Sequence, residues 1–147
     1  MHISEGVLSG PVLVTGAAMA LAGTSVGLRR LDLDRVAQAG MLAAAFFVAS
    51  LIHVPVGPSS VHLILNGVVG LLLGWAAFPA ILTALLLQAM LFQYGGITTL
   101  GVNTVIMAAP AVACYHLCGP FVLKSASWAA IAAFACGGSI SFNDRKS

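Results

Sequence analysis

The residues in this sequence that are best suited to chemistry are its four histidines. Imidazole is the commonest side-chain ligand of transition metals and changes its charge near neutral pH. His2, His53 and His62 stand in polar or proline-containing stretches, whereas His116 stands in an apolar segment, where we expect a packed or interfacial residue. The sequence has no GxxxxGK[ST] or HExxH motif, which argues against nucleotide binding and zinc-protease chemistry.

His2 is distinguished by its position next to the start of the chain. With Met1 retained, the terminal amine, the amide nitrogen of His2 and an imidazole nitrogen of His2 form two adjoining chelate rings. The amide must lose its proton to bind, which only a strong Lewis acid makes favourable near neutral pH. Copper(II) and nickel(II) stand high in that affinity order and accept planar nitrogen sets, and cobalt(II) stands just below them.

A fourth nitrogen would complete this donor set, and from the residues alone either His53 or His62 can supply it. Residues 1–6 lack the positively charged start of a signal peptide. Removal of the initiator methionine needs a small second residue, which histidine is not. We therefore expect Met1 to be the mature N-terminus, with a free amine.

The elements that must position these residues are transmembrane helices. Of the 147 residues, 60% are hydrophobic and only 7% are charged, whereas soluble domains carry about 25% charged residues. Most of the surface must therefore face lipid. The small net charge of +2 gives no basic face for nucleic acid. The three cysteines, Cys114, Cys118 and Cys136, form no CxxC pair, so we expect packing residues rather than disulfides.

The apolar pattern predicts an all-α, polytopic helix bundle that forms one membrane domain over residues 1–147. We expect about six helices, over residues 7–28, 36–52, 61–78, 80–92, 104–117 and 128–140. The loop at 29–35 carries three of the six basic residues, which predicts that it is cytoplasmic. The N-terminus, His53 and His62 would then lie outside, in a multi-pass protein of the cell (inner) membrane.

Two function classes besides metal transport are open at this level. A metal-dependent intramembrane enzyme needs a general base, and Glu5 is the only acid close to the expected site, so we expect no enzyme. In a passive channel or assembly subunit the histidines would be incidental. A bound nickel or cobalt ion would favour a transporter, zinc with turnover an enzyme, and no metal a channel.

Three stretches resemble one known family, the CbiM/NikM substrate-binding membrane components of cobalt and nickel energy-coupling-factor transporters. Residues 1–6 resemble the family's opening MHIxxGxL, and residues 57–63 resemble its GGTSGHL loop. Residues 88–89 and 95–103 are similar to its segment QALLFxDGG[IL]TxLGxN. The three motifs occur in family order and extend from residue 1 to about residue 115.

The resemblance implies a metal site, a function and partners. The family holds its metal through the terminal amine, the amide and imidazole of the second residue, and the loop histidine. By motif match these are Met1, His2 and His62. The implied function is capture of Ni²⁺ or Co²⁺, the transported substrate, for ATP-driven import. The implied partners are a transmembrane coupling subunit, cytoplasmic ATPase subunits and a small accessory membrane protein.

The resemblance also points to residues that would cover or orient the site, which are Ser59, Ser60, Thr99 and Asn103. His53 stands where the family generally has no histidine, and we keep it as an alternative or transient ligand. The chain departs from the family at Pro58 and Val61, which replace glycines, and at Gln93–Tyr94, which replaces a pair ending in aspartate. Family members usually carry further helices, and the tail from about residue 141 resembles none of them. We therefore expect an atypical, truncated C-terminus.

Overall fold

The computed structural model describes residues 3, 5–52, 55–56 and 59–122, with backbone alone at 55–56, 59–64 and 119–122. Its elements are α1 (Gly10–Arg29), α2 (Leu33–Leu51), β1 (Pro55–Val56), β2 (Ser59–Ser60), α3 (Val61–Leu73), the 3₁₀-helix η1 (Gly74–Ala76), α4 (Ala77–Phe92) and α5 (Leu100–Val122). Four stretches among the described residues are long and apolar enough to cross a membrane: 10–29, 33–51, 65–92 and 100–118. The described part is a membrane helix bundle, to which β1 and β2 add a short antiparallel pair.

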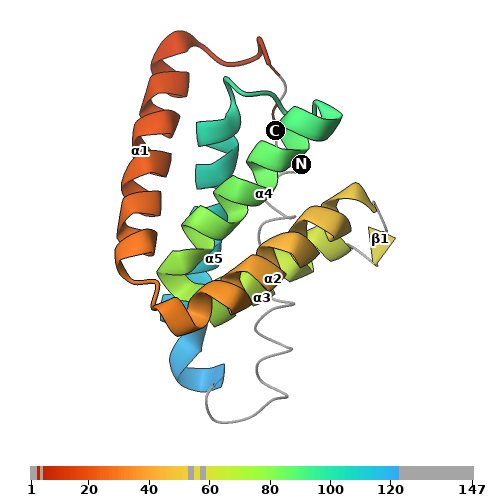
Figure 1. Ribbon diagram of the computed structural model, residues 1–147. Coiled ribbons are helices and arrows are strands. Elements are labelled where there is room, and N and C mark those ends of the chain that lie inside the picture. The colour runs from red at the N-terminus through yellow and green to blue at the C-terminus, as the bar shows by residue number, and fades with distance from the viewer. Residues whose placement is uncertain (1–2, 4, 53–54, 57–58, 123–147) are drawn as a thin grey trace.

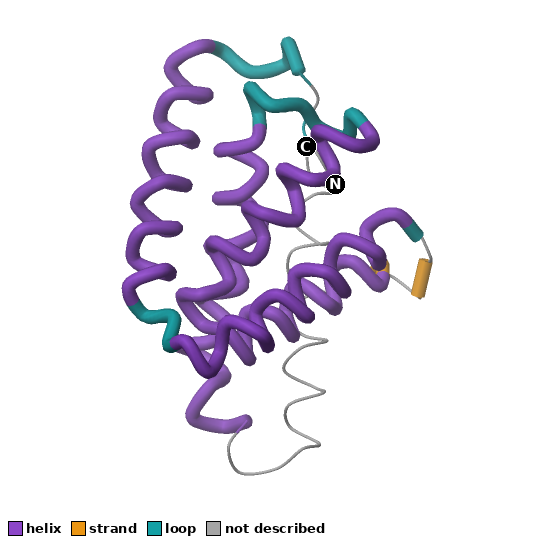
Figure 2. The backbone as a smooth tube through the Cα atoms, viewed as in Figure 1, coloured by secondary structure: helices purple, strands orange, loops and turns teal. Residues whose placement is uncertain are grey.

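The helices run back and forth between two ends of the bundle (Figure 1). The N-terminal segment and the α4–α5 loop lie at one end, and the α1–α2 turn lies at the other (Figure 2). We call the first, formed by residues 3–9 and 93–99, the clamp end. We call the second, which contains residues 29–32, 74–76 and 115–116, the arginine end.

Helix α1 packs its small residues inward and turns its large ones outward. Its buried residues are Gly16, Ala20, Gly23 and Gly27. Large apolar side chains on the same helix are exposed, among them Val14 at 70% and Leu21 at 66%. Membrane helices show this pattern because lipid solvates large apolar side chains, whereas small residues allow backbones to approach closely. The outer face of α1 is therefore suited to lipid.

The core lies where α3, α4 and α5 meet, and α2 adds Phe46 to it. Its members are Phe46, Val69, Ala77, Phe78, Ile81, Ala84, Leu85, Met107, Ala108, Ala111 and Val112. Small and large residues alternate across this contact, so the three helices pack tightly around the axis that joins the two ends.

The boundary between the third and fourth helices differs from the sequence prediction. We expected the chain to turn at Pro79, but α3 ends at Leu73 and the turn is η1. Gly74 has a φ of 56°, a left-handed conformation that glycine adopts at little cost. Pro79 lies in the first turn of α4, where its missing N–H breaks no helical hydrogen bond.

The fifth helix is longer than predicted at both ends. The expected range was 104–117, whereas α5 spans Leu100–Val122 and continues through Gly119 and Pro120. A proline inside a membrane helix is tolerated when neighbouring groups satisfy the freed carbonyl. The expected sixth helix at 128–140 and the tail from 141 lie outside the described residues.

The expectation for the cysteines is wrong at Cys114. This residue is buried in α5 and is disulfide-bonded. Local spacing motifs such as CxxC identify pairs that are close in sequence, so they do not reveal a bridge formed through tertiary structure.

Candidate functional site at the clamp end

The side chain of Asn103 bonds to both the N–H and the carbonyl of Ile3. The Ile3 N–H donates to Asn103 Oδ1 at 2.9 Å, and Asn103 Nδ2 donates to the Ile3 carbonyl at 3.3 Å. The amide of Asn103 thus pairs with the main chain much as a neighbouring strand would. Asn103 is only 3% exposed, so water competes little for these bonds. The residue that follows His2 is therefore anchored to the start of α5.

Thr99 supports the same contact from one helical turn earlier. Its hydroxyl donates to the Ile3 carbonyl at 3.0 Å and lies 3.3 Å from the Gly96 carbonyl. Thr99 and Asn103 are four residues apart, so both side chains reach the same face at the N-terminal end of α5. Asn103 Nδ2 also lies 3.4 Å from Thr99 Oγ1. Ile3, Thr99 and Asn103 form what we call the N-terminal clamp.

A second, exposed layer of contacts joins the N-terminal segment to the loop before α5. Glu5 Oε1 accepts hydrogen bonds from the backbone N–H and the hydroxyl of Thr98, each at 3.3 Å. Gly96 has a φ of 123°, and a Cβ at this position would overlap the side chain of Glu5. Sequence reasoning did not pair Glu5 with this loop, although the double glycine before the two threonines signals an unusual backbone.

Helices α3 and α5 cross in the middle of the bundle (Figure 1), and the contacts around the crossing follow a regular register. Partners are 41 residues apart in sequence over three successive turns. The pairs are Asn66 with Met107, Gly70 with Ala111 and Gly74 with Tyr115. At Gly70 a Cβ would overlap the Ala111 backbone, so the two helices are in direct contact there. The closest approach of the two helices is therefore at Gly70 and Ala111, near the middle of α5.

Position 62 lies in the first turn of α3. Ser59 and Ser60 form β2 immediately before it. Met1, His2 and His53 lie outside the described residues, and the side chain of His62 is likewise not described. No three His, Cys, Asp or Glu side chains among the described residues are grouped closely enough to hold a metal ion.

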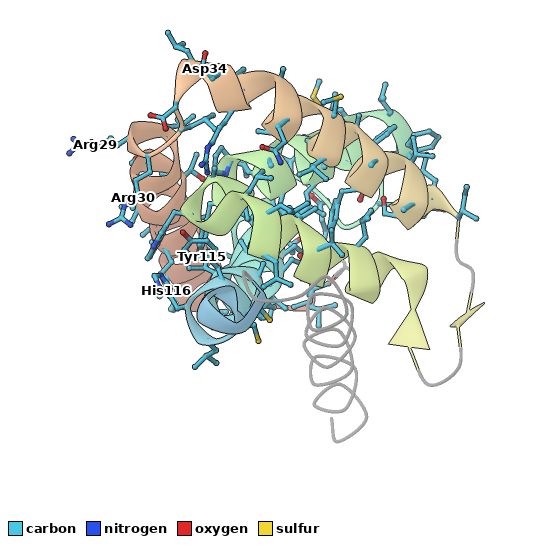
Figure 3. All side chains as sticks on the ribbon, turned by 90° about the horizontal axis from the view of Figure 1, so that it is seen from below. Arg29, Arg30, Asp34, Tyr115 and His116 are labelled. Carbon is cyan, nitrogen blue, oxygen red and sulfur yellow. The ribbon has the colours of Figure 1, made fainter. Side chains whose placement is uncertain are left out.

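His116 lies at the opposite end of the bundle, where its ring is already in use. The Trp75 indole N–H donates to His116 Nε2 at 3.2 Å, and Tyr115 contacts the imidazole edge-on at 5.3 Å between ring centroids. The guanidinium of Arg30 lies 5.7 Å from the centroid of Trp75. Figure 3 shows Arg30 and His116 on the same side of the molecule. These contacts agree with the expectation of a packed or interfacial residue.

The sequence matches one protein family over nearly its whole length. Residues 2–143 match the CbiM family, described as the cobalt uptake substrate-specific transmembrane region. The chain belongs to this family. The match includes the clamp residues Thr99 and Asn103 and position 62, so the geometry at the clamp end is that of a CbiM-family member.

Relatives within and around the CbiM family carry names that refer to metal transport. A protein of Haemophilus influenzae named for metal transport is 60% identical over 80% of this chain and 57% of its own length. The fused nickel transport protein NikMN of Rhodobacter capsulatus is 39% identical over 74% of this chain and 33% of its own length. The chain thus spans about a third to just over half of these relatives.

A solved structure supports the same fold. The crystal structure of a truncated transition metal transporter superposes with a TM-score of 0.76 at 26% sequence identity. The match covers 96% of this chain and 70% of that one. The predicted family is therefore confirmed by the sequence pattern, by the relatives and by the fold.

Proposed function

We propose that this protein captures Ni²⁺ or Co²⁺ at its N-terminus and passes the ion inward as part of an energy-coupling-factor transporter. The observation that carries the proposal is the N-terminal clamp, which anchors Ile3 to the start of α5. An anchored third residue restricts where the residues before it can lie. The proposed ligands are the Met1 amine, the His2 amide and imidazole nitrogens, and His62.

The clamp also explains why His2 would be the last residue whose backbone nitrogen binds the metal. An amide nitrogen binds a metal only after it loses its proton, but the Ile3 N–H is used as a donor to Asn103. Ile3 therefore keeps its proton and is excluded as a ligand. Amine, amide and imidazole supply three nitrogens, and a fourth must come from another element. The motif match assigns this fourth nitrogen to His62, at the start of α3.

The names of relatives support the metals and the partners. The family description refers to cobalt uptake and a fused relative to nickel transport, and both ions suit an all-nitrogen donor set. A fused transport protein also indicates that this module works with further components. We propose a transmembrane coupling subunit, cytoplasmic ATPase subunits and a small accessory membrane protein. ATP hydrolysis by those partners, not an enzymatic step in this chain, would drive import.

We further propose that the clamp end faces outward across the cell membrane and the arginine end faces the cytoplasm. Arg29 and Arg30 are exposed at the arginine end, as the positive-inside rule requires. Single cysteines at Ser60 and Asp32, in a background without native cysteines, test this with an impermeant thiol reagent. Ser60→Cys should label in intact cells and Asp32→Cys only after the membrane is opened. The reverse pattern would show that the orientation is wrong.

The decisive experiment concerns the terminal amine. An extension of several residues placed before Met1 converts the amine into an amide, so a neutral donor becomes a group that must also be deprotonated. A single added residue is avoided, because it would place the histidine third in the chain, where a new amine, two amides and the imidazole form another four-nitrogen set. We expect nickel and cobalt affinity, measured by calorimetry in detergent, to fall by more than the about 100-fold typical of losing a supporting residue. Circular dichroism should show unchanged helicity, because no membrane segment is altered.

A removable extension provides the matched control. Proteolytic cleavage that regenerates Met1 as the first residue should restore the affinity of the native protein. His2→Ala should be about as harmful as the extension, since it removes the imidazole. Tight binding by the extended protein would mean that the amine is not a ligand and that the proposed site is wrong.

A further inference from the structure

Asn66 presents a buried acceptor that has no partner within the part of the chain that the structure describes. The residue lies in α3 and is 2% exposed. Its Nδ2 donates to the Met107 carbonyl at 2.9 Å, which fixes the orientation of the side-chain amide. Its Oδ1 is buried and has no hydrogen-bond partner among the described residues. Such atoms are rare in folded proteins, because an unpaired buried acceptor loses its bonds to water without replacement.

The position of Asn66 relates it to the proposed metal site. It follows position 62 by four residues, so the two positions share a face of α3 one turn apart. Its partner Met107 follows Asn103 by four residues on α5. Asn66 therefore lies one turn further along α3 than position 62, and it contacts the residue one turn further along α5 than Asn103.

Other buried polar groups at this level are already engaged. Thr104 donates its hydroxyl to the Leu100 carbonyl at 2.8 Å, and Thr99 bonds to Ile3. The other buried side-chain atom without a partner in the described ranges is Thr24 Oγ1, which belongs to α1 rather than to α3 or α5. Asn66 Oδ1 is thus the acceptor on the α3 face that is available to a new donor.

A metal-bound histidine supplies such a donor. An imidazole that binds a metal through one nitrogen carries its proton on the other, and that N–H nearly always meets a carboxylate or carbonyl oxygen. We propose that Asn66 Oδ1 accepts the N–H of His62 when His62 binds the metal. Asn66 would be a positioning residue that fixes the ring orientation and raises its basicity. This inference rests on the proposed function, in which His62 is a ligand.

A double-mutant cycle tests the inference with Ni²⁺ as the probe. Calorimetry compares the native protein, His62→Ala, Asn66→Leu and the double variant. Asn66→Leu removes the acceptor in a side chain of similar size, so we expect about a 10- to 100-fold loss of affinity. The same substitution in the His62→Ala background should change nothing, because its effect acts through the imidazole.

Asn66→Asp separates the acceptor from the packing. Aspartate keeps an acceptor oxygen but has no N–H to donate to the Met107 carbonyl. If Asn66 acts only through that structural bond, nickel affinity should fall. If Asn66 positions His62, nickel affinity should be near-native or higher. Asn66→Asp and Asn66→Leu are compared with His62 present, so the result can be read even if His62→Ala binds nickel too weakly to measure. Thr104→Val, another buried polar residue made apolar at constant size, is the matched control and should leave affinity unchanged.

The outcomes separate the two proposals. Unchanged affinity in His62→Ala would contradict the proposed function. Two results would contradict the role of Asn66 while a loss of affinity in His62→Ala keeps the proposed function. One is that Asn66→Asp binds nickel as weakly as Asn66→Leu does. The other is that Asn66→Leu lowers nickel affinity by the same factor with His62 present and with His62 replaced by alanine.

Discussion

The polar side chains at the two ends of α5 have different kinds of partner. At the arginine end the ring of His116 accepts from Trp75 and packs against Tyr115. At the clamp end the buried side chains of Thr99 and Asn103 bond instead to the backbone of Ile3. The first arrangement consumes the imidazole in side-chain contacts. The second fixes the main chain at residue 3.

This difference is the reason for proposing the metal site at the clamp end. Buried polar side chains that hold main chain are costly to place, and they make sense where a short segment must adopt one path. Residue 3 lies outside any helix, so the bonds to Thr99 and Asn103 are what hold its backbone in place. The aromatic cluster at the arginine end stabilises the turn at η1 and offers no such device.

The largest expected effect distinguishes the two ends by their histidines. His62→Ala should weaken nickel affinity beyond the about 10- to 100-fold that follows loss of a supporting residue, because it removes a proposed ligand. His116→Ala, at the arginine end, should leave affinity unchanged and affect only stability. His53→Ala, measured in the same calorimetric series, should also have much the smaller effect. Equal losses at positions 62 and 116 would abolish the distinction between the two ends.

A smaller effect is expected from the clamp itself. Asn103→Leu removes both bonds to Ile3 and should lower metal affinity about 10- to 100-fold while leaving helicity intact. Asn103→Asp keeps the acceptor for the Ile3 N–H and should retain part of that affinity. Isothermal calorimetry with Ni²⁺ measures both. Native affinity in Asn103→Leu would mean that the terminus finds its position without the clamp.

Much of the bundle could be predicted from the sequence, because lipid imposes long apolar helices. The ranges expected at 7–28 and 36–52 correspond to α1 and α2 within a few residues. The turn before α4 could not be placed, since Gly74 and Pro79 both interrupt helices and only the backbone φ decides between them. The start of α5 was missed because Leu100 and Gly101 follow a glycine-rich run that reads as loop.

The candidate site was predictable in its residue types but not in its contacts. The resemblance singled out Thr99 and Asn103, yet no sequence rule states that an asparagine will pair with the backbone of residue 3. Such pairs depend on the crossing of α1 and α5, where Gly16 contacts Val102. The unpaired oxygen of Asn66 was likewise invisible, because burial and partners are tertiary properties.

The smallest expected effect concerns Glu5, whose bonds to Thr98 are exposed and long. Glu5→Ala removes an acceptor that water partly replaces, so nickel affinity should fall by less than about tenfold. Glu5→Gln keeps the oxygen while losing the charge and is the matched control. Native-like binding by Glu5→Gln would assign the residue to positioning the segment. A loss in Glu5→Gln as large as that in Asn103→Leu would instead show that the negative charge attracts or binds the cation, and the outer layer of the clamp end would then belong to the metal site.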